Sequence, residues 1–211
     1  MPKFFVDRDS IIDVNNIVIK GEDVNHIKKV LRMDIGDNIT VCNKDVSENF
    51  FCEIEEFKDD SIVCKVIKKL DSEAESNLCI TIFQGLPKAD KMELIIQKST
   101  ELGVTNIVPT VMKRCVVKID KKDEIKKQAR WQKIAEVAAK QSGRDVVPIV
   151  KDFMGITEIC SIINNYDLVL VAYENEENNS IKNEIEKIKK ETMKNLKIRF
   201  NYRTRRRVRV I

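Results

Sequence analysis

Cations and amides that could hold a polyanion gather in four short segments of this sequence. In the first, His26–Arg32, the side chains of Lys28, Lys29 and Arg32 surround the end of a predicted helix. Lys and Arg contacts of this kind hold nucleic-acid phosphates and fix register without reading bases. A solvated helix face explains the same residues, and for this segment alone it is the default interpretation.

The second segment, Gln84–Val104, begins where a predicted strand enters a helix through a turn with Gly85 and Pro87. Backbone N–H groups and the side chains of Lys88 and Lys91 would then lie at the carboxyl edge of a sheet, where open α/β folds bind ligands. The segment has neither the G-x-G-x-x-G of a dinucleotide fold nor the G-K-[ST] of a P-loop. It therefore predicts a ligand site without naming the ligand.

The third and fourth segments add two arginines and an amide. Arg114 lies among apolar residues in Pro109–Lys118, and Gln141 and Arg144 lie at the end of an alanine-rich helix. Gln and Arg together can bind a nucleobase edge and a phosphate. Arg144 is explained equally well as a cation that stabilises a helix C-terminus.

The elements that must position these residues are β-rich in the first seventy positions. Runs of β-branched and aromatic residues separated by turn signals predict the strands Ile39–Cys42, Phe50–Phe57 and Ile62–Ile67. One short helix interrupts them, with Asp23 as its predicted N-cap. Its apolar stripe is predicted from spacing and consists of Val24, Ile27, Val30 and Leu31.

Strands and helices alternate after a polar linker at residues 71–77. Alternation of this kind indicates an α/β domain with a mainly parallel sheet. The predicted elements are strand Leu78–Gln84, a helix capped by Asp90, strands Asn106–Val111 and Arg114–Val117, a helix from about Lys122 to Ser142 that Gly143 ends, helix 155–164, strand Asp167–Tyr173, helix 180–194 and strand Leu196–Phe200.

The net charge of +4 does not by itself indicate a nucleic-acid partner. Six of the eleven arginines lie in residues 199–211, where there is no acid, so residues 1–198 carry a net charge of −2. Nucleic-acid binding would need a local basic face instead.

Other function classes are disfavoured by composition. No apolar run is long enough for a membrane helix, and the N-terminus is not a secretory signal. The six cysteines form no C-x-x-C pair and the chain has one His, so we expect no metal site. Reduced cysteines inside apolar runs are typical of a cytosolic protein, and we expect a cytoplasmic one.

These segments, in this order, resemble the RsmE family of small-subunit ribosomal RNA methyltransferases. The resemblance covers residues 1–150 and the strand at 167–173. Its most specific part is the pattern K-x-x-K-M-E-x-x-x-Q-K-x-x-E-L-G-V at residues 88–104. The other matching stretches are M-P-K-F-F-V, H-I-K-K-V-L-R-M-D-I-G-D and W-Q-K-I-A-E-V-A-A-K-Q-S-G-R-D-V-V-P.

The resemblance implies a fold and an activity. It implies a PUA-like, RNA-binding β-barrel at residues 1–72 and a SPOUT α/β methyltransferase domain at 73–200, in which a trefoil knot forms the pocket for S-adenosyl-L-methionine. It also implies a homodimer that methylates N3 of uridine 1498 in the 16S rRNA of the small ribosomal subunit.

The same resemblance assigns roles to the residues above. Arg114, Gln141 and Arg144 would position the nucleotide. The residues expected to contact the RNA backbone are His26, Lys28, Lys29, Arg32, Lys88 and Lys91. Methyl transfer to N3 needs alignment of the reacting atoms and loss of the N3 proton, but no residue is identified as the base.

Residues 201–211 depart from the family pattern. The family has a glycine-rich I-G-P-E-G-G-F loop after this strand and an L-G-x-R-I-L-R-x-E-T-A segment further on, and both form the cofactor pocket. If Arg203, Arg205, Arg206 and Arg207 use AGA or AGG and Arg209 uses CGA, codons for Asn201–Ile211 can be chosen that spell I-I-G-P-E-G-G-F-E when read one base later. We therefore expect a frame slip shortly before Asn201, an out-of-frame tail at 201–211, no cofactor-binding residues in frame after Phe200, and negligible methyltransferase activity.

Two other functions remain open at this level. A non-catalytic RNA-binding protein would use the β-barrel as its site and the Arg-rich tail for salt-dependent affinity. Another SPOUT enzyme with a different RNA target would share the fold, since one fold serves several functions.

Overall fold

The computed structural model describes residues 2–13, 15–44, 48–71, 75–76, 78–88, 90–112, 120–172, 182–183 and 197–202. The chain divides into two compact units. Unit 1 is Met1–Glu75 together with Lys140–Val146, and unit 2 is Ser76–Ala139 together with Val147–Ile211. The boundary predicted after residue 72 did not include Lys140–Val146 on the N-terminal side.

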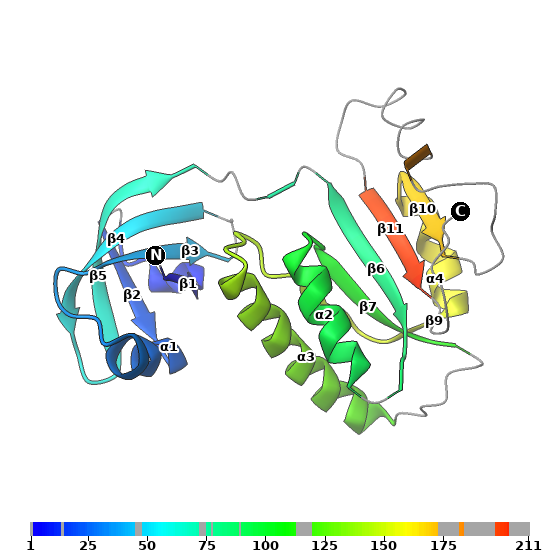
Figure 1. Ribbon diagram of the computed structural model, residues 1–211, viewed down its shortest axis with the longest axis horizontal. Helices are drawn as coiled ribbons and strands as arrows, with labels where there is room; N and C mark the ends of the chain where they lie inside the picture. Colours follow the sequence, from blue (N-terminus) through cyan, green and yellow to red (C-terminus); the bar gives the residue numbers. More distant parts are fainter. Residues whose placement is uncertain are drawn as a thin grey trace. The chain divides into compact units, whose positions relative to one another are not determined.

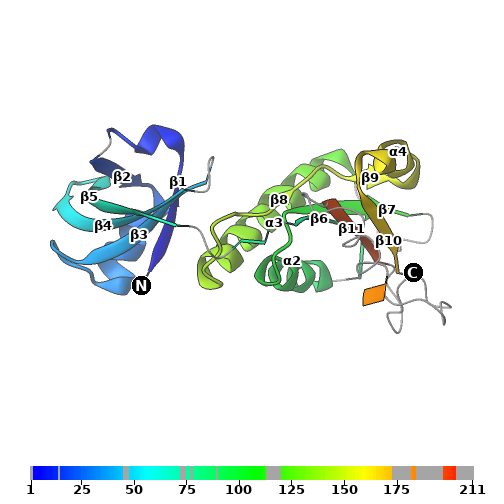
Figure 2. The same ribbon diagram turned by 90° about the horizontal axis from the view of Figure 1, so that it is seen from above.

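Unit 1 is built on a five-stranded sheet that curls round its own core (Figures 1 and 2). The strands are β1 (Lys3–Val6), β2 (Asn16–Lys20), β3 (Asn38–Asn43), β4 (Glu48–Phe57) and β5 (Ser61–Leu70), in the order β1-β3-β4-β5-β2. The pair β1–β3 is parallel and the other pairs are antiparallel. Among the described strands no pairing of β1 with β2 closes the sheet into a hydrogen-bonded barrel.

Alternation of side chains along the strands forms the core of unit 1. On β4 and β5 the side chains of Cys52, Ile54, Ile62 and Cys64 are fully buried, while Lys65 points to solvent. Successive residues of a strand face opposite sides, so one face of the sheet supplies the apolar core. Phe4, Ile17, Ile19, Ile39 and Val41 complete the same cluster.

The segment between β2 and β3 differs from the predicted helix. Helix α1 (Glu22–Asn25) follows Gly21, whose φ is +75°, so Asp23 lies in the first turn and is not the N-cap. It continues as the π-helical turn η2 (His26–Leu31), which ends at Arg32 with a left-handed φ of +51°. A π turn is wider than an α turn, which shifts the 3.6-residue period. Val24 and Ile27 are buried as predicted, but Val30 is 70% exposed and Leu31 39% exposed, so the predicted stripe is wrong at both of these residues.

Unit 2 is an α/β unit with a parallel sheet, as the alternation predicted. Its elements are β6 (Cys79–Gly85), α2 (Lys91–Glu101), β7 (Asn106–Val111), α3 (Lys121–Gln141), β8 (Ile149–Val150), β9 (Met154–Gly155), α4 (Ile156–Ile162), β10 (Leu168–Val171) and β11 (Lys197–Tyr202). The order is β10-β11-β6-β7-β8, with β9 also on β7, and every pairing is parallel. β11 therefore inserts between β10 and β6 (Figure 1).

Helices cover both faces of this sheet. Trp131, Ala135 and Ala138 recur along one face of α3, and the first two pack with Met92 and Ile96 of α2 on Ile107 of β7. The opposite face carries Phe83 and Val108, against which Ile159 of α4 packs. Within the described part of the chain, no helix is long and apolar enough to cross a membrane.

Several predictions fall outside the described residues. They are Arg114 and the strand Arg114–Val117, most of helix 180–194, and the tail from Arg203 to Ile211. The knot expected from the family resemblance depends on chain beyond Tyr202 and stays a prediction.

Candidate functional site

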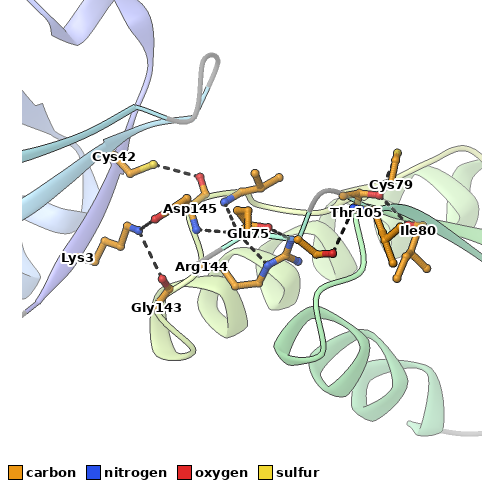
Figure 3. A network of polar contacts seen from close by, with 12 residues as sticks. Lys3, Cys42, Glu75, Cys79, Ile80, Thr105, Gly143, Arg144 and Asp145 are labelled. Carbon is orange, nitrogen blue, oxygen red and sulfur yellow. Dashed lines mark hydrogen bonds and ion pairs between the residues drawn. The ribbon is translucent and has the colours of Figure 1, made fainter. Parts of the chain in front are cut away.

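A polar network holds the loop between α3 and β8, the segment that carries the predicted residues Gln141 and Arg144 (Figure 3). Its centre is the carboxylate of Glu75. Oε2 accepts a hydrogen bond from Arg144 Nη2 at 2.6 Å, and Oε1 accepts one from Arg144 Nε at 3.2 Å. Oε1 also accepts the backbone N–H groups of Asp145 at 2.8 Å and Val146 at 3.1 Å. All of these residues belong to unit 1.

Burial decides what Arg144 does in this arrangement. The residue is 4% exposed, and its guanidinium forms a two-point ion pair with Glu75. Such bidentate pairs are among the stronger polar contacts in proteins. The predicted role of Arg144 in nucleotide binding would therefore require this pair to open.

Glu75 is the residue of this site that sequence reasoning missed. It lies in the polar stretch predicted to be a linker, and 69 positions separate it from Arg144. A carboxylate among polar residues has no local pattern that reveals a distant partner. Only the folded chain identifies it, through the hydrogen bonds that its carboxylate accepts from Arg144 and the loop.

Asp145 ties the same loop to the sheet of unit 1. Its carboxylate forms an ion pair with Lys3, whose Nζ also donates to the carbonyl of Gly143 at 3.5 Å. The thiol of Cys42 on β3 donates to the carbonyl of Asp145, with Sγ and O 3.1 Å apart. Burial raises the pKa of the Cys42 thiol to about 11, although the nearby Lys3 lowers it somewhat. Cys42 is thus a neutral donor at physiological pH.

At the end of α3, Lys140 forms an ion pair and Gln141 is exposed. Lys140 Nζ contacts both carboxylate oxygens of Asp23 on α1, at 2.7 and 3.0 Å. Gly143 takes a left-handed φ of +71° after the helix, a conformation that suits glycine. The side chain of Gln141 faces solvent, whereas Arg144, predicted to act with it, is buried.

In the η2 segment, too, one cation contacts the protein and others are exposed. Lys28 Nζ donates to the carbonyl of Lys58 at 2.6 Å and lies 5.5 Å from the centre of the Phe57 ring. Lys29 and Arg32 are exposed. His26 is also exposed, and its ring meets the edge of Phe4 with 6.2 Å between centroids. Within this segment the structure leaves Lys29, Arg32 and His26 open to a ligand.

The carboxyl edge of the parallel sheet is the second candidate region. The strands β6, β7, β10 and β11 end there at Gly85, Val111, Val171 and Tyr202. Gln84 is buried and donates from Nε2 to the carbonyl of Gly85 at 2.8 Å, while the N–H of Leu86 donates to Thr110 O at 3.2 Å. These bonds order the turn that leads to α2. Such edges are where open α/β sheets bind ligands.

The predicted cations near this edge are only partly described. Lys88 is exposed shortly before α2, and Lys91 is exposed as its first residue. Arg114 lies outside the described residues. Among the described residues, no three of His, Cys, Asp and Glu come together as a set that could hold a metal ion.

Two family models match this chain, over successive parts of the sequence. Residues 19–67 match the model of an RNA methyltransferase PUA domain, and residues 74–199 match that of an RNA methyltransferase domain. The chain is 39% identical over 176 residues to "Ribosomal RNA small subunit methyltransferase E" of Bacillus subtilis, covering 82% of this chain and 68% of that protein. A relative of the same name from Buchnera aphidicola is 29% identical over 174 residues, with the same shares covered.

Solved structures share the fold over most of the chain. A structure titled as a hypothetical protein has a TM-score of 0.82 at 34% identity, covering 94% of this chain and 79% of the other. Ribosomal RNA small subunit methyltransferase E from Neisseria gonorrhoeae, bound to S-adenosyl methionine, has a TM-score of 0.76 at 25% identity, covering 95% and 79%. A structure from Legionella pneumophila shares the fold with a TM-score of 0.73 at 23% identity.

Proposed function

Because the chain belongs to the ribosomal RNA small subunit methyltransferase E family, we propose that the reaction its fold serves is methylation of N3 of uridine 1498 in 16S rRNA. The observation that carries the proposal is the match of the RNA methyltransferase domain to residues 74–199, which include the parallel sheet of unit 2. The PUA match at 19–67 supports an RNA substrate. The same proposal takes residues 1–72 as the RNA-binding domain and 73–200 as the methyltransferase domain.

S-adenosyl-L-methionine is the methyl donor in this proposal, since a structural relative binds it. The donor supplies an electrophilic methyl group. At the carboxyl edge of the sheet, Gly85 has no side chain to obstruct a ligand, which suits close approach to the backbone. After β11, however, the sequence runs Arg203, Thr204, Arg205, and it has no glycine after Gly155. These residues do not fit the glycine-rich loop that the family resemblance requires.

The chain's own residues have a positioning task. Uracil N3 must face the reacting methyl carbon in line, and it must lose its proton before or during the reaction. Gln141, Lys29 and Arg32 are exposed and have the chemistry to bind a base edge or a phosphate. We assign them to positioning the RNA, and we assign no described residue as the base.

Activity of these 211 residues by themselves is a separate part of the proposal. Since residues 201–211 do not fit the cofactor loop, we propose that this polypeptide binds S-adenosyl-L-methionine weakly and transfers methyl groups negligibly. The expected frame slip before Asn201 accounts for the mismatch. The proposal also includes a cytoplasmic homodimer, which sedimentation equilibrium would check.

The test compares two polypeptides on small ribosomal subunits that lack the modification. One is the chain as given, and the other is translated from the same gene with the frame shifted by one base before Asn201. A methyl group on N3 blocks Watson–Crick pairing, so reverse transcription should stop beside uridine 1498 only with the second. A stop elsewhere would refute the site, and micromolar cofactor binding by the chain as given would refute its inactivity.

A further inference from the structure

The outer face of α3 carries a row of lysines that the proposed function has not used. Lys122, Lys126 and Lys133 are all exposed, and we call them the α3 ridge. Their separations of four and seven residues place them on one side of a helix with 3.6 residues per turn. At 1.5 Å per residue they stand about 6 Å and about 10 Å apart along the axis.

Contacts on the inner side of α3 settle which way this ridge faces. Trp131 and Ala135 are in the core of unit 2, and Trp131 stacks on Phe153 with 5.7 Å between ring centroids. Gln128 Nε2 donates to Val150 O and to Asp152 Oδ1, both at 3.0 Å. These anchors hold the opposite face of the helix against the sheet, so the ridge points to solvent.

Charge along α3 contrasts with the rest of the body. Residues 121–133 contain six cations and two acids, a net charge of +4, although residues 1–198 as a whole carry −2. The rest of the first 198 residues is therefore acidic, with a net charge of −6. A basic stretch in an otherwise acidic body is a candidate for the local basic face that nucleic-acid binding requires.

Two neighbouring cations of α3 contact other side chains of unit 2. Arg130 Nη2 contacts Glu93 Oε1 of α2 at 2.7 Å, and Lys127 Nζ lies 6.0 Å from the centre of the Trp131 ring. Both belong to the packing of α3 on its surroundings. The three ridge lysines point away from that packing.

Resting on the proposed function, we propose that the α3 ridge binds the phosphate backbone of the substrate rRNA. The row follows a line, as a polynucleotide backbone does, and its contacts would fix register without reading bases. An acidic protein segment is the alternative partner for such a row. The membership of unit 2 in an RNA methyltransferase family favours RNA.

The experiment measures binding of the 211-residue chain to a 16S rRNA fragment that contains the substrate uridine, over a series of salt concentrations. The ridge variant is Lys122→Gln/Lys126→Gln/Lys133→Gln, since Gln keeps the helix propensity of Lys. The slope of log K against log salt is negative, and each lost phosphate contact makes it shallower by about 0.7 to 0.9. The slope of the ridge variant should therefore be shallower by roughly 2 to 3. A Lys→Arg triple at the same positions should keep the slope.

A matched control removes the same charge elsewhere in unit 2. Lys98→Gln/Lys151→Gln/Lys182→Gln replaces three exposed lysines that lie off α3 and should change the slope by less than about 1. An equal change of slope in the control, or no change in the ridge variant, would overturn this inference and leave the proposed function standing. Poly-glutamate binding as tight as RNA binding, with the same sensitivity to the ridge, would assign the surface to an acidic protein. Failure of the unaltered chain to bind the fragment would overturn the proposed function as well.

Discussion

Replacing Glu75 with Ala should release the loop between α3 and β8 without unfolding unit 1. The change removes the acceptor of four hydrogen bonds, two from Arg144 and one each from the backbone N–H groups of Asp145 and Val146. It also leaves the guanidinium of Arg144, which is 4% exposed, without the counter-charge of Glu75.

The size of the effect follows from burial. Removal of one partner of a buried ion pair costs about 3–5 kcal/mol, because the remaining charge is left uncompensated. The side chain of Glu75 is 18% exposed, so water can reach the vacated position and the lower end of that range applies. About 3 kcal/mol corresponds to roughly a 100-fold change in the equilibrium for opening the loop.

Amide hydrogen exchange measured by NMR reads this equilibrium directly. The N–H groups of Asp145 and Val146 should exchange roughly 100-fold faster in Glu75→Ala. Glu75→Gln should give a smaller increase, since it keeps an acceptor oxygen but loses the charge. The N–H of Gly155, which donates to Glu158 Oε2 at 2.6 Å in unit 2, serves as the internal control and should not change.

Two results would refute this reasoning. One is unchanged exchange at Asp145 and Val146 in a folded Glu75→Ala protein. The other comes from the double variant Glu75→Ala/Arg144→Met, which removes the stranded charge as well. If the loop of the double variant opens as readily as that of Glu75→Ala, the buried cation is not the source of the cost.

Two further predictions concern the cores of the two units. Trp131→Ala should lower the free energy of unfolding by about 3–5 kcal/mol in urea denaturation, because it empties the contact with Phe153; a loss below 1 kcal/mol would contradict that packing. Burial raises the pKa of Cys52 and Cys64 to about 12. The folded state therefore keeps protons that the unfolded thiols release above about pH 9, so unfolding at pH 10 should need less urea than at pH 8. A midpoint independent of pH would count against the buried thiols.

The parallel sheet of unit 2 was predictable because its signal is local. Strand Asn106–Val111 has the predicted bounds, and α3 begins and ends within one residue of the predicted helix. The insertion of β11 between β10 and β6 was not predictable in the same way. Strand order depends on contacts between distant parts of the chain, and single-strand patterns do not record which strands become neighbours.

The stripe on the first helix failed for a different reason. Spacing placed Val30 with Val24 and Ile27 on the assumption of a regular α-helix. The π turn of η2 breaks that period, and Val30 faces solvent beside the cation Lys29. No residue in the segment signals a π turn by its type, so the error could not be avoided from propensity alone.

Among the described residues, some cations pair with a carboxylate and others are exposed, and the sequence motifs do not predict which. Lys3, Lys140 and Arg144 each pair with a carboxylate of unit 1 that is far away in sequence. Arg144, which was predicted to position the nucleotide, is therefore engaged in holding residues 140–146. Lys29, Arg32 and the α3 ridge are exposed instead, so a polyanion can reach them without opening a buried ion pair. The RNA contacts should therefore be sought among these exposed cations, and Arg144 should join them only if its pair with Glu75 opens.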